Sequence, residues 1–360
     1  MIWVGRNDEH VLLIEGYSQS IVDSSSSVRM AAENLETSGL GICLVVEPAG
    51  KLVGVVSDGD IRRGLLRGRT LDDSVVDVMS TAFTFSRESS ELSELQRITR
   101  SSLLTHLPLL SAEGLVRGLF VDKRDNVEFA KDNLVVIMAG GKGSRLRPLT
   151  DTTPKPMIPV AGKPMLQRII EGLRFEGFRK FALSINYLGE QIESHFGDGS
   201  GFDVEISYLR EEVPLGTGGA LSLLESNQIR PLVVVNGDVL LSAKLVEMLN
   251  FHEESGASLT VGVKVLDTQI PYGVVEIEGH SIKGIQEKPT YRDFVNAGIY
   301  VVEPQLLGLV PKRVRFDMPE LVEKVIESGD VAVAFPLHEA WLDLGRPEDL
   351  DRAQREHEGS

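Results

Sequence analysis

The sequence predicts an α/β domain with a mostly parallel central sheet, preceded by a smaller α+β domain. From Leu134 onward, short apolar runs alternate with amphipathic stretches, a pattern typical of parallel strands connected by helices. Before Leu134, the chain instead contains two similar helix–strand–strand segments. At 360 residues, the chain is long enough for two or three domains and a sizeable core.

The composition is that of an ordinary soluble globular protein, with 42% hydrophobic and 25% charged residues. No apolar run approaches the roughly 20 residues of a membrane span, and the first residues lack the basic-then-apolar order of a signal peptide. The net charge of −16 argues against nucleic acid, because binding a phosphate backbone requires a broad basic surface. The one cysteine, Cys43, excludes an internal disulfide and fits a reducing compartment. We therefore expect a cytoplasmic protein without a membrane or nucleic-acid partner.

The N-terminal part contains an internal repeat. Residues 42–56 predict a β-hairpin with a turn at residues 48–50, and residues 106–120 predict a second hairpin. The glycines of the two hairpins align with an offset of 64 residues in both cases, Gly50 with Gly114 and Gly54 with Gly118. A helix is predicted before each hairpin, at residues 28–37 and 90–100, and Ser24 to Ser27 provide a cap for the first.

A unit of this size cannot bury its apolar face alone, so the two copies, at about residues 10–66 and 75–128, should pack together in a domain of residues 1–129. The first copy carries GVVSDGDIR at residues 54–62, which resembles the strand-end pattern of CBS modules, small regulatory units that often bind adenine nucleotides. The resemblance implies that Ser57 faces phosphate and that Asp60 accepts from the ribose hydroxyls of an adenine or guanine nucleotide. The second copy has Val121 in place of Ser57 and Arg124 in place of Asp60. A structural or dimerising role of the pair therefore stays open beside a regulatory one.

The segment from Leu134 to Pro164 indicates an anion-binding site. Its apolar start predicts a buried strand at residues 134–138, and this strand leads directly into the loop AGGKG at residues 139–143. Glycines let backbone N–H groups approach a phosphate without a Cβ in the way. Four cations follow with a single acid, Asp151, among them: Arg145, Arg147, Lys155 and Lys163. Neither the Walker pattern nor the G-x-G-x-x-G spacing of dinucleotide folds is present.

This segment resembles the signature of the sugar-1-phosphate nucleotidyltransferases, roughly G-G-x-G-[ST]-R-L-x-P-L-T followed by P-K-P, and every position is filled between Gly140 and Pro156. The resemblance implies a Rossmann-like domain over residues 133–355, reached through a short polar linker at 130–133. It implies transfer of a nucleoside monophosphate from a triphosphate to a sugar-1-phosphate. Arg145 would act on the transition state and the leaving pyrophosphate, and Lys155 on the phosphates of both substrates. The nucleotide would lie on Ala139, Gly140, Gly141, Gly143 and Ser144.

Further elements follow the same alternation. Strands are predicted at residues 181–185, 204–208, 232–235 and 259–265, and helices at residues 167–176, 220–225 and 242–254. Ligands of such sheets bind at the carboxyl ends of the strands.

Residues 211–220, EEVPLGTGGA, resemble the base-recognition turn of the same family, which adds Gly216 and Thr217 to the nucleotide site. Guanine offers two adjacent donors that a carboxylate can accept together, whereas uracil and thymine offer one donor flanked by acceptors. Glu211 or Glu212 therefore favours guanine.

Metal and sugar-phosphate ligands are expected from the later segments. Asp238 ends an apolar strand in the sequence Asn-Gly-Asp, and the resemblance adds Asp343 as the second ligand of Mg²⁺, which proteins usually hold by one or two carboxylates. The family's order of short motifs implies a sugar-phosphate pocket formed by Tyr272, Gly273, Glu287, Lys288, Asn296 and Gly298.

A CBS pair joined to this domain resembles the guanylyltransferases of the bacterial legionaminic-acid route, which make GDP-glucosamine from glucosamine-1-phosphate and GTP. Three alternatives stay open: a mannose- or heptose-1-phosphate guanylyltransferase, a uridylyl- or thymidylyltransferase, and a non-catalytic nucleotide-sensing protein. The expected partners are the two substrates and further copies of the chain in a homo-oligomer.

Overall fold

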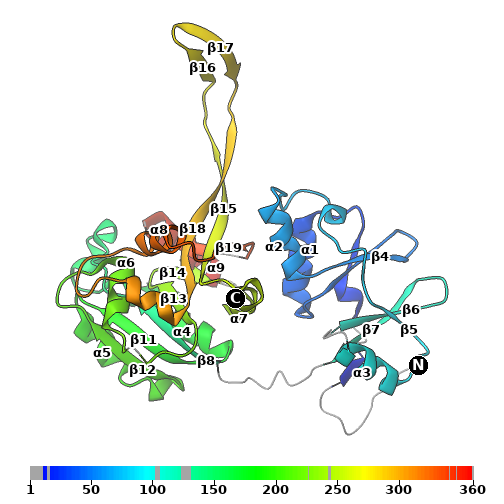
Figure 1. The fold of residues 1–360 in the computed structure, drawn as a ribbon, viewed down its shortest axis with the longest axis horizontal. Helices are drawn as coiled ribbons and strands as arrows, with labels where there is room; N and C mark the ends of the chain where they lie inside the picture. The colour runs from blue at the N-terminus through cyan, green and yellow to red at the C-terminus, as the bar shows by residue number, and fades with distance from the viewer. Residues whose placement is uncertain are drawn as a thin grey trace. The chain divides into compact units, whose positions relative to one another are not determined.

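The structure is a computed structural model that describes residues 11–13, 17–101, 106–122, 131–225, 227–241, 245–339, 341–345 and 347–358. The chain divides into two compact units, Met1–Glu128 (unit 1) and Phe129–Ser360 (unit 2) (Figure 1). Hydrophobic clusters fill the interior of each unit. In the part of the chain that is described, no helix is long and apolar enough to cross a membrane.

Unit 1 contains the same small fold twice. The first copy comprises β2 (Ile21–Asp23), α1 (Val28–Ser38), β3 (Cys43–Val46), β4 (Leu52–Val56) and α2 (Asp58–Leu66). The second comprises β5 (Ser86–Arg87), α3 (Leu92–Ser101), β6 (His106–Leu110) and β7 (Val116–Asp122), with β1 (Val11–Leu13) beside β7. In both copies the first strand is parallel to the second, and the second is antiparallel to the third.

The registers confirm the repeat predicted from the glycines. Val45 pairs with Gly54 and Leu109 pairs with Gly118, and a bulge follows each pair at the same place. The two copies also meet at equivalent positions, because Lys51 pairs with Leu115 in an antiparallel bridge. Around this bridge, Leu52 N donates to Gly114 O at 3.1 Å and Val116 N donates to Gly50 O at 3.3 Å. Unit 1 therefore has an approximate two-fold axis between its two sheets.

Burial makes the stability of unit 1 depend on pH. His106 begins β6, and burial lowers the pKa of its imidazole from 6.5 to about 4. Between these values the unfolded chain binds more protons than the folded one, so stability should fall as the pH is lowered from 6.5 towards 4. We expect a loss of about 2 kcal/mol at pH 5 relative to neutral pH. Thermal unfolding at pH 7.5 and 5.0 should show a smaller pH effect in His106→Gln, and an equal effect in both proteins would contradict this assignment.

The central sheet of unit 2 contains seven strands in the order β12, β11, β8, β13, β18, β15, β19. Their bounds are β8 (Lys131–Met138), β11 (Phe178–Ile185), β12 (Glu205–Arg210), β13 (Leu232–Asn236), β15 (Leu259–Gln269), β18 (Thr290–Val302) and β19 (Ala332–Leu337). All neighbouring strands are parallel except for the two pairs that β18 forms. The mostly parallel sheet predicted from the sequence is confirmed.

Helices cover both faces of this sheet. Alternate residues of β8 face opposite sides, so Val135 and Ile137 join one hydrophobic cluster while Val136 joins another. The first cluster includes residues of α4 (Met165–Phe175), α5 (Gly189–Phe196), α7 (Leu245–Ser255) and α9 (Pro347–Glu358). The second includes residues of α8 (Met318–Glu327) and of the 3-10 helices η7 (Ala220–Leu223) and η8 (Pro304–Leu309).

Two local predictions are wrong. The predicted linker at 130–133 overlaps β8, because Lys131 already pairs with Phe178 of β11. Polar residues fit this end of the strand, since Asp132 is exposed and pairs with Lys180 at 3.1 Å.

The predicted helix at 220–225 is the short 3-10 helix η7, which follows the four-residue helix α6 (Gly216–Gly219). Ser222 Oγ donates to Gly219 O at 2.6 Å and stabilises this tight turn. The predicted helix at 242–254 corresponds to α7, and residues 242–244 lie outside the described residues.

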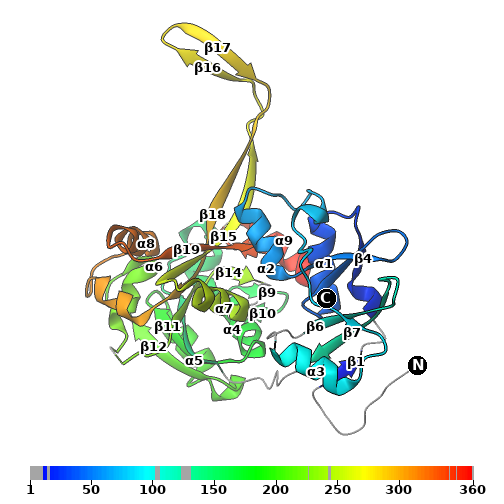
Figure 2. The ribbon, with the colours of Figure 1, turned by 45° about the vertical axis from the view of Figure 1, so that its right-hand side comes forward.

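Strands β15 and β18 extend far beyond the sheet as a two-stranded arm (Figure 2). We define the arm as residues 264–295. Its outer end is a hairpin of β16 (Val274–Glu278) and β17 (Ser281–Gln286), which pairs with no strand of the central sheet in the described residues. From Leu266 to Phe294 most residues of the arm are exposed.

Candidate active site

The carboxyl ends of four neighbouring strands meet at one edge of the sheet. Ala139, Asn186 and Glu211 directly follow β8, β11 and β12, and Asp238 lies two residues after β13. Backbone hydrogen bonds continue between these segments, since Ala139 N donates to Ser184 O at 2.9 Å and Glu211 N donates to Ile185 O at 3.0 Å. This edge is where open α/β sheets bind their ligands.

The glycine loop lies between Glu211 and Lys155. A Cβ on Gly140 would approach Glu211 Oε1 to 2.9 Å. Gly143 has a φ of +59°, and a Cβ there would come within 2.8 Å of Lys155 Cβ, so this position requires glycine. A Cβ on Gly141, in contrast, would meet no atom of the described residues within 4 Å, so this side of the loop is open.

Two cations at this loop have no acidic partner among the residues that are described. Lys142 and Arg145 are exposed, and no carboxylate of the described chain lies within 4.0 Å of either. The nearby Arg147, in contrast, pairs with Asp151 at 3.3 Å. In a chain of net charge −16, two uncompensated cations beside open backbone N–H groups favour an anionic ligand.

An ion pair connects the glycine-loop segment to the end of β13. Lys155 Nζ lies 2.5 Å from Asp238 Oδ2, and the two side chains are 13% and 30% exposed. Lys155 sits in the 3-10 helix η5 (Lys155–Met157), whose neighbours Pro156 and Ile158 are buried. Both charges are therefore held next to the glycine loop.

The oxygen ligands around Asp238 fit a magnesium ion. β20 (Trp341–Asp343) pairs with β14 (Val239–Leu241), and this pairing sets Asp343 opposite Val239. Leu344 N also donates to Asp238 O at 2.9 Å, so the two backbones run side by side; the Asp343 side chain lies outside the described residues. Asn236 Oδ1 is buried and has no hydrogen-bond partner within the described part of the chain. A carboxylate and an amide oxygen at one strand end are ligands that Mg²⁺ accepts.

The family model of the nucleotidyl transferases matches residues 134–359, more than half of the chain. The chain belongs to the nucleotidyl transferase family. A CBS domain model matches residues 20–67, the first copy of the repeat in unit 1.

Curated relatives of this nucleotidyl transferase differ in the base they use. A UTP–glucose-1-phosphate uridylyltransferase of Synechocystis sp. is 34% identical over an alignment of 240 residues, with 61% of this chain and 62% of the relative covered. A mannose-1-phosphate guanylyltransferase of Mycobacterium tuberculosis is 33% identical over an alignment of 226 residues, with 60% of this chain and 62% of the relative covered. The chain thus spans less than two thirds of the length of these relatives.

Solved structures show the same fold for unit 2. HddC from Yersinia pseudotuberculosis matches with a TM-score of 0.51 and 26% identity, covering 62% of this chain and 99% of that one. A second structure of HddC, complexed with GMP-PN, has the same TM-score at 25% identity. A putative glucose-1-phosphate thymidylyltransferase from Bacillus anthracis also has a TM-score of 0.51 at 25% identity.

In this nucleotidyl transferase, the two candidate base readers are not equivalent. Ser184 Oγ donates to Glu211 Oε1, and Leu215 N donates to Glu211 Oε2 at 2.7 Å, so both carboxylate oxygens already hold the turn. Glu212 is exposed and pairs with Arg313 at 3.7 Å, a weak contact at the surface. Of the two, Glu212 is the one whose carboxylate stays available to a base.

Gly216 and Thr217 hold the start of α8. Thr217 N donates to Asp317 Oδ1 at 2.8 Å, and Thr217 Oγ1 accepts from Met318 N at 3.0 Å. Gly216 has a φ of +81°, and a Cβ there would lie 2.5 Å from Asp317 Oδ1. Helix capping therefore explains why a glycine and a threonine stand at positions 216 and 217. Their contact with nucleotide stays a prediction. Asp317 was missed from the sequence, although Asp-Met-Pro-Glu at 317–320 is a capping-box pattern.

The structure separates the six predicted sugar-phosphate residues into two groups. Gly298 lies at the strand-end site, because a Cβ on it would be 2.5 Å from Asn236 Nδ2. Asn296 stays beside it, where Oδ1 accepts from Gly298 N at 2.9 Å and Nδ2 donates to the Tyr300 hydroxyl at 2.6 Å. Burial raises the pKa of Tyr300, so its phenol stays neutral in this network.

The other four residues lie on the arm, far from this group: Tyr272, Gly273, Glu287 and Lys288. Glu287 and Gly273 are neighbours there, with a Cβ on Gly273 placed 3.0 Å from Glu287 Oε2. β18 begins at Thr290, and at ~3.3 Å per residue the strand from Asn296 to Thr290 spans roughly 20 Å. The single sugar-phosphate pocket predicted from the sequence stays a prediction.

In unit 1, Ser57 and Asp60 form a capping box at the start of α2. Ser57 N and Ser57 Oγ donate to Asp60 Oδ2 at 2.8 and 2.6 Å, and Arg63 Nη2 donates to Asp60 Oδ1 at 2.6 Å. Capping accounts for both residues, and their nucleotide contact stays a prediction. Arg124, which replaces Asp60 in the second copy, lies outside the described residues.

Proposed function

We propose that the protein transfers a nucleoside monophosphate from a nucleoside triphosphate to a sugar-1-phosphate and releases pyrophosphate. The observation that carries this proposal is the open glycine loop, with the exposed Arg145 on the same segment and the Lys155–Asp238 pair next to it. The names of the relatives support the same reaction class, since they are sugar-1-phosphate nucleotidyltransferases for uridylyl and guanylyl groups.

The reaction requires alignment and positive charge rather than a general base. A sugar-1-phosphate is largely dianionic at neutral pH, because its second pKa is about 6. One of its oxygens attacks the α-phosphorus, and the bond from this phosphorus to the bridging oxygen of pyrophosphate breaks. Arg145 would stabilise the charge that develops on the leaving pyrophosphate, and Lys155 would contact phosphates of both substrates. Asp238 and Asp343 would hold Mg²⁺, which when bound neutralises charge on the phosphates.

We propose GTP and glucosamine-1-phosphate as the preferred substrates. Glu212 carries the preference for guanine, because it is the one of the two glutamates whose carboxylate is not used inside the turn. Glu287 supplies a carboxylate that suits the amine of glucosamine, and Lys288 supplies an ammonium for the sugar phosphate. The uridylyltransferase among the relatives makes UTP with glucose-1-phosphate the second candidate pair.

Substitution of the two glutamates should separate base reading from loop structure. Glu212→Gln should lower kcat/KM for GTP about tenfold and leave UTP use unchanged, because an amide cannot accept from both guanine donors. Glu211→Gln should instead lower activity with every triphosphate, since it weakens the contacts with Ser184 and Leu215. Equal losses for GTP and UTP in Glu212→Gln would contradict its assignment as the base reader.

Pyrophosphate release across a grid of triphosphates and sugar-1-phosphates tests the function itself. GTP, UTP, dTTP and ATP would each be combined with glucosamine-, glucose- and mannose-1-phosphate in the presence of Mg²⁺. Release with one or more pairs supports nucleotidyl transfer, and the fastest pair identifies the substrates. Binding of nucleotide without release from any pair would favour the nucleotide-sensing alternative.

A further inference from the structure

The central sheet of unit 2 carries a groove at the end opposite to the candidate active site. The first residues of β8 and β11 line it, whereas the glycine loop and Asp238 follow the carboxyl ends of the strands. The groove is flanked by β12 on one side and by the segment between η7 and β13 on the other, and its volume is about 890 Å³. Its apolar lining includes Leu134, Leu209, Leu223, Leu224 and Ile229.

The groove exists because no helix of the described chain covers this part of the sheet. Elsewhere on the same face, α8, η7 and η8 pack against the strands. Between η7 and β13, however, the described residues contain no further helix. Alternate residues of a strand share a face, and Leu209 belongs to the cluster on this face. Glu205 and Ser207 therefore point to the same side, and both are exposed.

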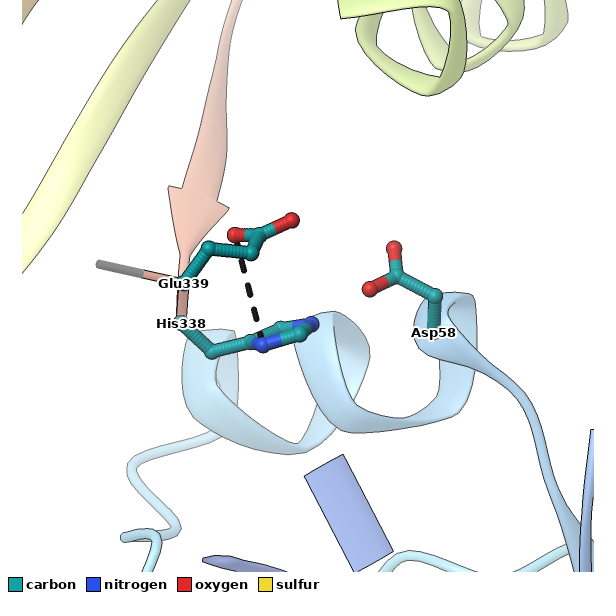
Figure 3. Close-up of side chains that lie close together, drawn as sticks. All are labelled: Asp58, His338 and Glu339. Carbon is teal, nitrogen blue, oxygen red and sulfur yellow. Dashed lines mark ion pairs between the residues drawn. The ribbon is translucent and has the colours of Figure 1, made fainter. Parts of the chain in front are cut away.

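The two edges of the sheet differ. At the β19 edge, Lys264 Nζ donates to the backbone carbonyls of His338 and Glu339, directly after the strand, at 3.3 and 2.7 Å. Figure 3 shows these two residues, whose side chains form an ion-pair contact at 4.0 Å. At the groove beside β12, in contrast, Ile229 is 90% exposed, more than any other large hydrophobic side chain that the structure describes. An apolar groove with an exposed isoleucine beside it is a surface that a protein partner would cover.

The charges of the groove are self-complementary. Most of its charged side chains have partners within the chain: Lys180 with Asp132 at 3.1 Å, Asp198 with Ser200 N at 3.0 Å, and Glu225 with Asn227 Nδ2 at 3.0 Å. Glu205 on β12 and Arg230 on the facing segment form no ion pair and no side-chain hydrogen bond with any described residue. In a two-fold contact, Glu205 of each copy can face Arg230 of the other. One unpaired acid and one unpaired base in the same groove therefore fit a second copy of the chain.

We propose that this groove is an interface between two copies of the chain, in which Ile229 of each copy enters the groove of the other and Arg230 pairs with Glu205 of the other copy. A volume of about 890 Å³ is enough for these side chains, because pockets of this size hold whole drug-sized ligands. Each copy gives and receives the same contacts, so the pair is closed. The interface lies away from the carboxyl ends of the strands and does not depend on the proposed function.

The first test measures the mass of the assembly. Light scattering on the full chain should show a dimer or a larger even assembly, and Ile229→Asp should halve this mass, because it places a carboxylate in an apolar groove. Ile326→Asp is the matched control, since Ile326 is 61% exposed on α8 and does not line the groove. Circular dichroism checks that both variants are folded. A monomeric wild type, an unchanged mass of Ile229→Asp, or an equal loss of mass in the control would overturn the proposal.

The second test reverses the two charges at low ionic strength. Glu205→Arg and Arg230→Glu should each lower the mass of the assembly, because each substitution places like charges opposite one another. An equimolar mixture of the two variants should regain the wild-type mass. In the mixed pair, the two substituted side chains face each other at one contact, and the two native side chains face each other at the second. Single variants of wild-type mass, or a mixture that stays dissociated, would show that Glu205 and Arg230 do not meet and would refute the interface.

Discussion

Arg145→Ala should lower kcat by two to three orders of magnitude without loss of stability. Removing one preorganised charge donor from a reaction that builds negative charge costs about 3–4 kcal/mol in the transition state. Arg145 is exposed and has no carboxylate partner within the described residues, so its removal breaks no internal ion pair there. Thermal unfolding of the variant should therefore match that of the wild type.

Arg147→Ala is the matched control for this experiment. Arg147 lies two residues further along the same segment and is exposed, but it pairs with Asp151 at 3.3 Å. If only the overall positive charge of the segment matters, both substitutions should lower kcat equally. If Arg145 makes a specific contact, only Arg145→Ala should lower kcat. Steady-state pyrophosphate release at saturating substrates gives kcat for both. A kcat within a few fold of the wild type in Arg145→Ala would remove this residue from the proposed mechanism.

The elements predicted best from the sequence are those specified by local pattern. The apolar run at 134–138 forms the C-terminal part of β8, and the glycines after it lie where the sheet edge requires close approach. The 64-residue repeat is reproduced down to the positions of two bulges. In these cases the residues that determine the structure are neighbours in the chain.

The predictions that depend on distant contacts were less accurate. Nothing in EEVPLG shows that Ser184, from a neighbouring strand, occupies one oxygen of Glu211. Thr217 likewise bonds to Asp317, one hundred residues away, so its capping role is invisible in the local sequence. The short motifs around Tyr272 and Glu287 predict a pocket, but the length of the β15–β18 pairing decides where that pocket can form.

Asp238→Asn should lower turnover at least 100-fold and weaken the affinity for Mg²⁺. An amide is a poorer ligand for Mg²⁺ than a carboxylate, so the Mg²⁺ concentration for half-maximal activity should rise. The substitution also removes the charged partner of Lys155, whose side chain is only 13% exposed. An ammonium left without its counter-ion in such a place costs about 1–3 kcal/mol, which should appear as a lower Tm in the absence of substrates.

In Asp238→Asn, substrate and metal should restore only part of the lost stability. This partial recovery distinguishes the role of Asp238 as a metal ligand from its role as the partner of Lys155. Triphosphate can replace the carboxylate as the partner of Lys155, so nucleotide should raise the Tm of Asp238→Asn by more than it raises that of the wild type. Asp151→Asn is the control, because its carboxylate is exposed and pairs with the exposed Arg147. Turnover and the Mg²⁺ requirement should therefore change together in Asp238→Asn. If both stay normal, the Asp238 carboxylate at the end of β13 serves only to hold Lys155 in place.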